Sequence, residues 1–439
     1  MNIKNILTSS FSKTLGGTFL VRVLSVGATF LCSVLLARTL GVENFGIYSY
    51  VLAIVSLLAL PAQAGMPTLI LRETARAKAL ADWPKMKGIW LWSGSTVLTI
   101  SFVVYFFVIV MKKTFFKDAM SGFEYSILSF GLLMSLLVAM GNVRGAALRG
   151  LGLIIQGQLP ESLIRPLLLA ILLLITVWLN VSINPTYAMA LHLIAAMIAF
   201  FFGTWLLFRA RPKELKQSKP TFQSKAWLFT ILPLAMMTGM QSLSGQVDIL
   251  MLGFLSTVSA VGAYKVVVSG AALAIFGLQV VGMVITPKFA SAYAKENYKE
   301  MQRVASIGSL LSFIMTLPVV IVFYYFGIEI LSFIYGNEYS VGYRALVIIS
   351  IGQAINAFFG SSIAILTMSG NEKFVINGMF LSVAINIILN IMLIPRLGID
   401  GAAIGVAVSM LVWNLYLWSS IKKQINIDCT FISYILRKT

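Results

Sequence analysis

Charged residues are scarce in this 439-residue sequence: they make up 11% of the chain, whereas hydrophobic residues make up 59%. Soluble domains usually carry about 25% charged residues, so the composition excludes an ordinary water-soluble protein. Apolar runs recur along the whole chain, and we predict an all-α polytopic membrane protein. The first run, residues 16–37, is interrupted by Arg22 and followed by many similar segments, so we interpret it as an uncleaved first span rather than a signal peptide.

Metal-binding and nucleophilic residue types are also rare. The chain has two cysteines, Cys32 and Cys429, and one histidine, His192, without metal-ligand or disulfide spacing. It lacks a P-loop, a G-x-S-x-G elbow and an H-E-x-x-H motif. We therefore expect neither metal nor cofactor, and a transporter rather than an enzyme.

Twelve segments are long and apolar enough to cross a bilayer, which takes about 20 residues. They lie at 15–36, 46–70, 88–111, 124–148, 153–179, 187–208, 227–250, 261–286, 305–326, 342–366, 374–394 and 399–420. The polar connector 209–225, interpreted as a solvated loop, divides them six and six. We predict a first lobe at 1–208, a basic cytoplasmic linker at 209–225, a second lobe at 226–420 and a cytoplasmic tail at 421–439.

The positive charge is strongly asymmetric. The net charge is +18, and most Lys and Arg residues fall in the segments that alternate spans place on one side. Cytoplasmic loops carry such an excess, so we predict that both termini are cytoplasmic. The basic composition therefore reports topology, and we expect no nucleic-acid partner.

The two halves share a faint internal repeat. Six identities occur 216 residues apart and align the second span with the eighth: Val42, Gly46, Tyr48, Val51, Leu57 and Gln63 match Val258, Gly262, Tyr264, Val267, Leu273 and Gln279. With six spans per half, both halves have the same orientation, as in transporters whose two lobes enclose a central cleft.

Nine charged residues lie inside predicted spans. Glu124 and Asp400 stand at span starts, and the other seven, with a basic excess, are Arg22, Arg144, Arg165, Lys265, Arg344, Glu161 and Asp248. Embedded charges usually face a bundle interior or a wet cavity. Arg22 either faces such a cleft or extends its side chain to the cytoplasmic interface. Arg344, near a span end, fits the second behaviour.

The other embedded charges also have two interpretations. Glu161 and Arg165 are spaced to neutralise each other on one helix face, or belong to a site on a helix broken by Pro160 and Pro166. Arg144 lies in a G-x-x-x-G spacing that permits close helix contact, and it serves packing or the cleft. Asp248 and Lys265 are candidates for a stabilising pair.

The second span contains Pro61, Gly65 and Pro67 around the polar Gln63. These residues indicate a deformable helix, either as a kink within the packing or as part of a site.

Two stretches, "LLARTLGVENFGIYSYVLAIVSLL" at 35–58 and "GNEYSVGYRALVIIS" at 336–350, resemble bacterial O-antigen-type polysaccharide repeat-unit flippases of the multidrug/oligosaccharidyl-lipid/polysaccharide exporter superfamily. A third, "VSAVGAYKVVVSG" at 258–270, resembles the opening of span 8 in related lipid flippases, where a basic residue faces the cleft. The resemblance implies a central cationic cleft lined by spans 1, 2, 7 and 8. It ranks Arg22, Gln63, Asp248 and Lys265 above the remaining candidates Arg144, Arg165 and Glu161. One departure is Thr238, which stands where the repeat would place a partner of Arg22.

The resemblance also implies a function. A flippase would move polyprenyl-pyrophosphate-linked oligosaccharides across the bacterial inner membrane by alternating access. Arg22 and Lys265 would face the pyrophosphate, and Asp248 would be a counter-charge or an ion-coupling acid. The implied partners are the lipid-linked oligosaccharide, membrane lipids and, as a candidate, the polysaccharide polymerase machinery.

Three other classes fit less well. A cation- or drug-extruding antiporter of the same superfamily is the main alternative, but it needs acids in its cavity and the first span has none. A major-facilitator carrier would show a G-x-x-x-D-R-x-G-R-R-like loop, unlike "ETARAKALADWPKMKG" at 73–88. A membrane glycosyltransferase or polymerase would need a large outer loop with catalytic acids.

The topology is testable with reporter fusions. Fusions after residues 80, 217 and 295 should report a cytoplasmic location, and fusions after 117, 183 and 337 an external one, because six spans precede the basic connector. A cytoplasmic signal at 183 would contradict the twelve-span topology, since span 5 or span 6 would not cross.

Overall fold

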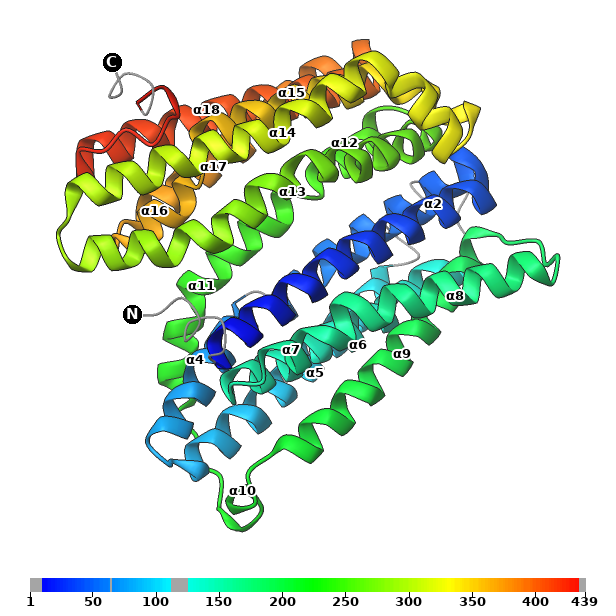
Figure 1. Ribbon diagram of the computed structural model, residues 1–439. Helices are drawn as coiled ribbons and strands as arrows, with labels where there is room; N and C mark the ends of the chain where they lie inside the picture. The colour runs from blue at the N-terminus through cyan, green and yellow to red at the C-terminus, as the bar shows by residue number, and fades with distance from the viewer. Residues whose placement is uncertain (1–9, 64, 112–124, 434–439) are drawn as a thin grey trace. The chain divides into compact units, whose positions relative to one another are not determined.

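The computed structural model describes residues 10–63, 65–111 and 125–433, and every regular element in them is helical (Figure 1). The elements are α2 (Ser10–Leu58), α3 (Leu60–Gln63), α4 (Met66–Ala79), α5 (Trp83–Met111), α6 (Tyr125–Gly150), α7 (Ile154–Leu159), the π-helix η1 (Pro160–Ile164), α8 (Arg165–Trp178), α9 (Pro185–Ala210), α10 (Glu214–Gln217), α11 (Ser224–Ser244), α12 (Val247–Leu255), α13 (Val258–Ala294), α14 (Tyr298–Ile334), the 3-10 helix η2 (Asn337–Gly342), α15 (Tyr343–Phe359), α16 (Ser362–Met368), α17 (Glu372–Leu397) and α18 (Ile399–Ile425). The predicted all-α membrane architecture is confirmed.

Eleven stretches of the described chain are long and apolar enough to cross a membrane, against the twelve predicted. The difference lies in α2, which joins the first predicted span to the beginning of the second. Its 49 residues would extend about 73 Å at 1.5 Å per residue, more than twice the bilayer core. Gly41 alone leaves the helical conformation, with φ 73° and ψ 170°, and kinks α2 between the two predicted spans. The count of twelve and the cytoplasmic termini stay predictions.

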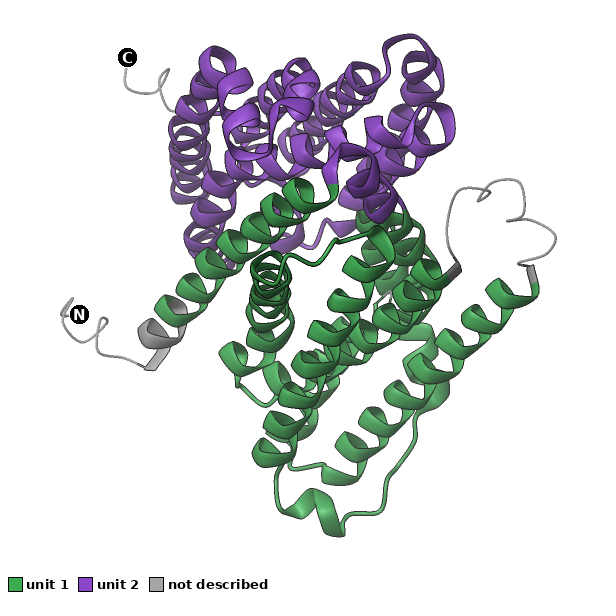
Figure 2. Cartoon of the chain, turned by 90° about the vertical axis from the view of Figure 1, so that its right-hand side faces the viewer, with its two compact units in different colours: residues 1–40, 51–242 green, residues 41–50, 243–439 purple. Residues whose placement is uncertain are grey.

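The chain forms two compact units that do not follow its sequence order (Figure 2). Unit 1 comprises residues 1–40 and 51–242, and unit 2 comprises 41–50 and 243–439. In unit 1, α6 packs against α4 and α9; in unit 2, α13 packs against α14 and α17 against α18. The helix that follows the connector, α11, therefore belongs to unit 1.

Side chains at helix starts explain several element boundaries. Asn184, Thr257 and Asn297 precede α9, α13 and α14, and each accepts a hydrogen bond from a backbone N–H of the first turn, at 2.7, 3.2 and 3.1 Å. Such caps satisfy donors that a helix start would leave without a partner.

The connector 209–225 is solvated at its charged side chains and also contacts unit 1. Leu215 is buried with Ala77, Met86 and Leu151. The Thr221 N–H donates to the Pro84 carbonyl at 3.0 Å, and Lys87 Nζ donates to the Ser218 carbonyl at 2.8 Å. Most charged side chains of the connector are exposed, as predicted, but its backbone is held.

The chain after α18 folds back onto unit 2. The Asp428 N–H donates to Gln302 Oε1 at 2.8 Å, and the Gln302 amide donates to the Asp428 carbonyl. Phe431 packs against Phe313 and Phe358, with ring centroids 5.0 and 4.9 Å apart. Burial raises the pKa of the Cys429 thiol to about 12, so the thiol stays protonated at physiological pH. Residues 434–439 lie outside the described part.

The internal repeat is visible as a reciprocal helix crossing within unit 2. A Cβ added to Gly46 would meet the Val258 carbonyl, and one added to Gly262 would meet the Val42 carbonyl. Val42 and Gly46 are the repeat equivalents of Val258 and Gly262. The two matched segments therefore contact each other through equivalent atoms, with backbones close because neither glycine carries a side chain.

Gly46→Ala should lower the stability of the protein by about 1–3 kcal/mol, because the methyl group has to displace a backbone carbonyl. Gly27→Ala, also in α2, is the matched control: nothing lies within 4 Å of its added Cβ. The thermal unfolding midpoint of purified protein measures the difference. Equal midpoints for the two variants would show that the crossing tolerates a side chain.

Candidate functional site

The helix break that carries Gln63 lies in unit 1. After α3 ends at Gln63, Gly65 adopts a left-handed conformation with φ 73°, and α4 begins at Met66 with Pro67 in its first turn. The predicted deformation is confirmed. The break frees the Gly65 N–H, which donates to Thr238 Oγ1 of α11 at 2.8 Å. Thr238 occupies the repeat position equivalent to Arg22. Its hydroxyl thus stabilises the break between α3 and α4.

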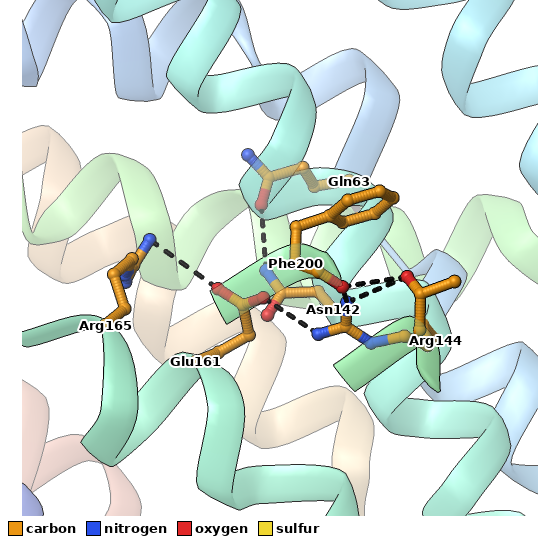
Figure 3. Close-up of polar contacts among 7 residues, drawn as sticks. Gln63, Asn142, Arg144, Glu161, Arg165 and Phe200 are labelled. Carbon is orange, nitrogen blue, oxygen red and sulfur yellow. Dashed lines mark hydrogen bonds and ion pairs between the residues drawn. The ribbon is translucent and has the colours of Figure 1, made fainter. Parts of the chain in front are cut away.

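Gln63 itself is half-buried and accepts a hydrogen bond from the Asn142 amide of α6 at 3.3 Å (Figure 3). Asn142 was not among the predicted site residues. Its position beside Gly141 and Arg144 in a polar stretch of an apolar span is the sequence signal that would have indicated it.

Arg144 forms an ion pair with Glu161, with Nη2 3.0 Å from Oε1. Its Nη1 donates to the Phe200 carbonyl and lies 3.4 Å from Thr204 Oγ1 (Figure 3). The predicted close contact at the G-x-x-x-G spacing is present: a Cβ on Gly141 would meet the Glu161 carboxylate, and one on Gly145 would meet the carbonyl of Gly157.

Arg165 forms the second ion pair of Glu161, with Nη1 3.8 Å from Oε2 (Figure 3). The predicted i,i+4 pair is therefore present, although it is the longer of the two. The predicted irregularity between Pro160 and Pro166 is also present, as the π-helix η1, in which the Arg165 N–H donates to the Pro160 carbonyl. π-Helical turns occur frequently at functional sites.

Asp248 of α12 has amide partners in unit 2. Asn386 and Asn390 of α17 donate to its Oδ1 at 3.0 and 2.8 Å, and the Tyr264 hydroxyl approaches the same carboxylate. The two asparagines are 7% and 0% exposed. The sequence analysis did not predict these two residues. Two asparagines four residues apart lie on one face of an apolar helix, and this pattern indicates a polar site.

Lys265 lies half-buried on α13, next in sequence to Tyr264. The predicted stabilising pair between Asp248 and Lys265 is wrong: no ion pair joins them in the described residues, and Asp248 Oδ1 accepts from asparagine amides instead.

Arg22 and Arg344 have exposed side chains. Arg22 belongs to unit 1 and Lys265 to unit 2. Their pyrophosphate-facing roles stay predictions. Among the described residues, no group of three or more His, Cys, Asp or Glu side chains is placed to hold a metal ion.

Comparison with known families identifies the chain. The family described as polysaccharide biosynthesis protein matches residues 13–293, more than half of the sequence. This chain belongs to that family. A second family, MatE, matches residues 233–392. The predicted membership in the multidrug/oligosaccharidyl-lipid/polysaccharide exporter superfamily is confirmed, and with it the assignment as a flippase-type transporter rather than an enzyme.

Two relatives of this chain are archaeal proteins. A probable low-salt glycan biosynthesis flippase, Agl15, of Haloferax volcanii is 22% identical over 405 residues, covering 90% of this chain and 80% of the relative. An uncharacterized membrane protein of Methanocaldococcus jannaschii is 27% identical over 177 residues, covering 40% of this chain and 35% of the relative.

Solved structures show the same fold. An inward-facing multidrug resistance MATE family transporter has a TM-score of 0.74 at 16% identity, covering 91% of this chain and 96% of its own. The lipid II flippase MurJ, in an inward closed conformation, has a TM-score of 0.72 at 15% identity, covering 92% and 86%. The resemblance thus extends over nearly the whole chain.

Thr238→Val should destabilise the protein by about 1–3 kcal/mol, because the isosteric side chain leaves the Gly65 N–H without an acceptor. Thr238→Ser keeps the hydroxyl and should preserve most of the stability. Thermal unfolding of the purified variants distinguishes them. If both variants unfold together with the wild type, the hydrogen bond does not support the break.

Proposed function

We propose that this protein moves polyprenyl-pyrophosphate-linked oligosaccharides from the inner to the outer leaflet of a bacterial cytoplasmic membrane, for the synthesis of O-antigen or another surface polysaccharide. The observation that carries the proposal is the excess of basic over acidic residues inside the spans of a flippase-family chain. The Haloferax volcanii relative, a probable glycan biosynthesis flippase, supports a glycan substrate.

The chemistry of the substrate explains the basic excess. Pyrophosphate and sugars are poorly soluble in hydrocarbon, whereas a polyprenyl tail remains in lipid. Arg22 supplies a planar fork and Lys265 a point charge for the phosphate oxygens. An inside-negative potential favours outward movement of two negative charges by about 4–5 kcal/mol per 100 mV.

Asp248 serves in this proposal as a counter-charge or an ion-coupling acid. Two buried amides donate hydrogen bonds to its carboxylate, which lowers the cost of burying this polar group. Alternating access of two lobes would carry the headgroup across, and a polysaccharide polymerase is a candidate partner.

A cation- or drug-extruding antiporter is the second candidate, since the MatE family matches part of the chain and MATE transporters share its fold. The described spans favour the flippase, because both acids predicted to be embedded already have partners. Glu161 contacts two arginines and Asp248 two asparagines.

Deletion of the gene should make lipid-linked repeat units accumulate on the inner leaflet while sugar synthesis continues. In the deletion strain, Arg22→Ala and Lys265→Ala should each reduce surface polysaccharide severely at normal membrane protein levels. Arg22→Lys should restore only part of it, because ammonium lacks the planar fork. Surface polysaccharide and immunoblots of membranes are the measurements.

Arg344→Ala is the matched control, since its side chain is exposed near a span end and has no assigned role. Normal surface polysaccharide in the deletion strain, without a second flippase gene, would contradict the proposed function. Full export by Arg22→Ala would instead exclude only the role of that arginine, because Lys265 would remain as a phosphate-facing candidate.

A further inference from the structure

Three charged side chains of unit 1 form a cluster with an excess of positive charge. Arg144 and Arg165 both contact the single carboxylate of Glu161 (Figure 3). Two cations and one anion leave one positive charge without compensation within the cluster. An uncompensated buried charge is costly. The contacts of the two arginines distinguish the one that supports the fold from the one that is available to a ligand.

The pair of Arg144 and Glu161 is built into the packing. Arg144 is 6% exposed, and its guanidinium also donates to the Phe200 carbonyl. Two glycines make room for the pair: a Cβ on Gly203 would meet the Arg144 guanidinium, and one on Gly141 would meet the Glu161 carboxylate. These features indicate a structural ion pair that α6 and α9 are shaped to enclose.

Arg165 is held much more loosely at its side chain. It is 24% exposed, against 6% for Arg144, and its Nη1 lies 3.8 Å from Glu161 Oε2, beyond hydrogen-bond distance. No hydrogen bond of its guanidinium occurs within the described ranges, and Glu161 Oε2 accepts none either. Its five N–H donors are therefore available to a second anion.

The backbone around Arg165 is nevertheless fixed. The Arg165 N–H closes the π-helical turn on the Pro160 carbonyl, and the Pro166 carbonyl accepts a hydrogen bond from Cys32 Sγ of α2 at 2.8 Å. The backbone of Arg165 is therefore fixed, whereas its guanidinium is loosely paired and partly exposed. This combination is suited to ligand binding rather than to packing.

We propose that Arg165 is an anion-binding residue that takes a phosphate group of the substrate, and that Glu161 is the counter-ion it releases when the phosphate binds. This inference rests on the proposed flippase function and adds a binding residue to it. Exchange of partners leaves no charge alone, because Glu161 keeps Arg144 while Arg165 forms a forked pair with phosphate oxygens. The ligand class is a phosphate or diphosphate ester.

Binding of farnesyl pyrophosphate to the purified full-length protein tests the proposal, with farnesol as the uncharged counterpart and inorganic pyrophosphate as the tail-free one. Arg165→Gln should weaken binding of farnesyl pyrophosphate at least about tenfold, as expected when a charge-assisted pair is lost, and leave the thermal unfolding midpoint near that of the wild type. Arg165→Lys should recover part of the affinity. Titration calorimetry gives the Kd.

Two further variants separate binding from folding. Arg144→Gln should lower the unfolding midpoint, because it removes the enclosed partner of Glu161. Arg209→Gln removes one exposed positive charge from the same unit, which lies over the Trp205 ring, and should change neither affinity nor midpoint.

Three results would overturn the inference: an unchanged Kd for Arg165→Gln, a loss of stability equal to that of Arg144→Gln, or wild-type protein that binds farnesyl pyrophosphate no better than farnesol. Each leaves the flippase proposal standing as long as the deletion strain fails to export polysaccharide. Normal export in that strain contradicts the flippase proposal independently of any Kd.

Discussion

A helix in an apolar medium satisfies its own backbone hydrogen bonds, and each place where it breaks needs a partner from a neighbouring helix. Most irregularities of this protein follow from that constraint. The left-handed Gly65 releases an N–H, and the Thr238 hydroxyl accepts it. The turn between Pro160 and Pro166 keeps its hydrogen bonding by widening to a π-helix. Both breaks lie next to polar side chains. The candidate site residues therefore lie where the backbone departs from a regular α-helix.

The same constraint applies to charge. The structure supplies Asp248 with two neutral amide donors from one helix face. It compensates Glu161 with two arginines, one enclosed and one loosely held. The two units therefore accommodate a buried acid differently: unit 2 provides it with amide hydrogen-bond donors, and unit 1 provides it with two arginines.

Short-range features of the fold and site could be predicted from the sequence, and contacts between distant segments could not. Composition predicts the spans, and the prolines and glycines around Gln63 and Glu161 predict the broken helices, because these residue types act on their own backbone. The Glu161–Arg165 pair follows from helical spacing. The partners of Asp248 lie 138 and 142 residues away, and no local pattern connects them. The docking of the connector depends on a hydrogen bond from the Thr221 N–H to the Pro84 carbonyl. Both are backbone groups, so the residue types at these positions do not predict the contact.

The assignment of residues 41–50 to unit 2 has a consequence for the order of biosynthesis. This segment is made early, but the backbone that it contacts, around Val258 and Gly262, is synthesised 216 residues later. At about 5–20 residues per second, the ribosome needs roughly 10–40 s to produce it. All of unit 1 has been made once residue 242 is synthesised, so the segment 41–50 meets its partner only after the unit that surrounds it in sequence is complete.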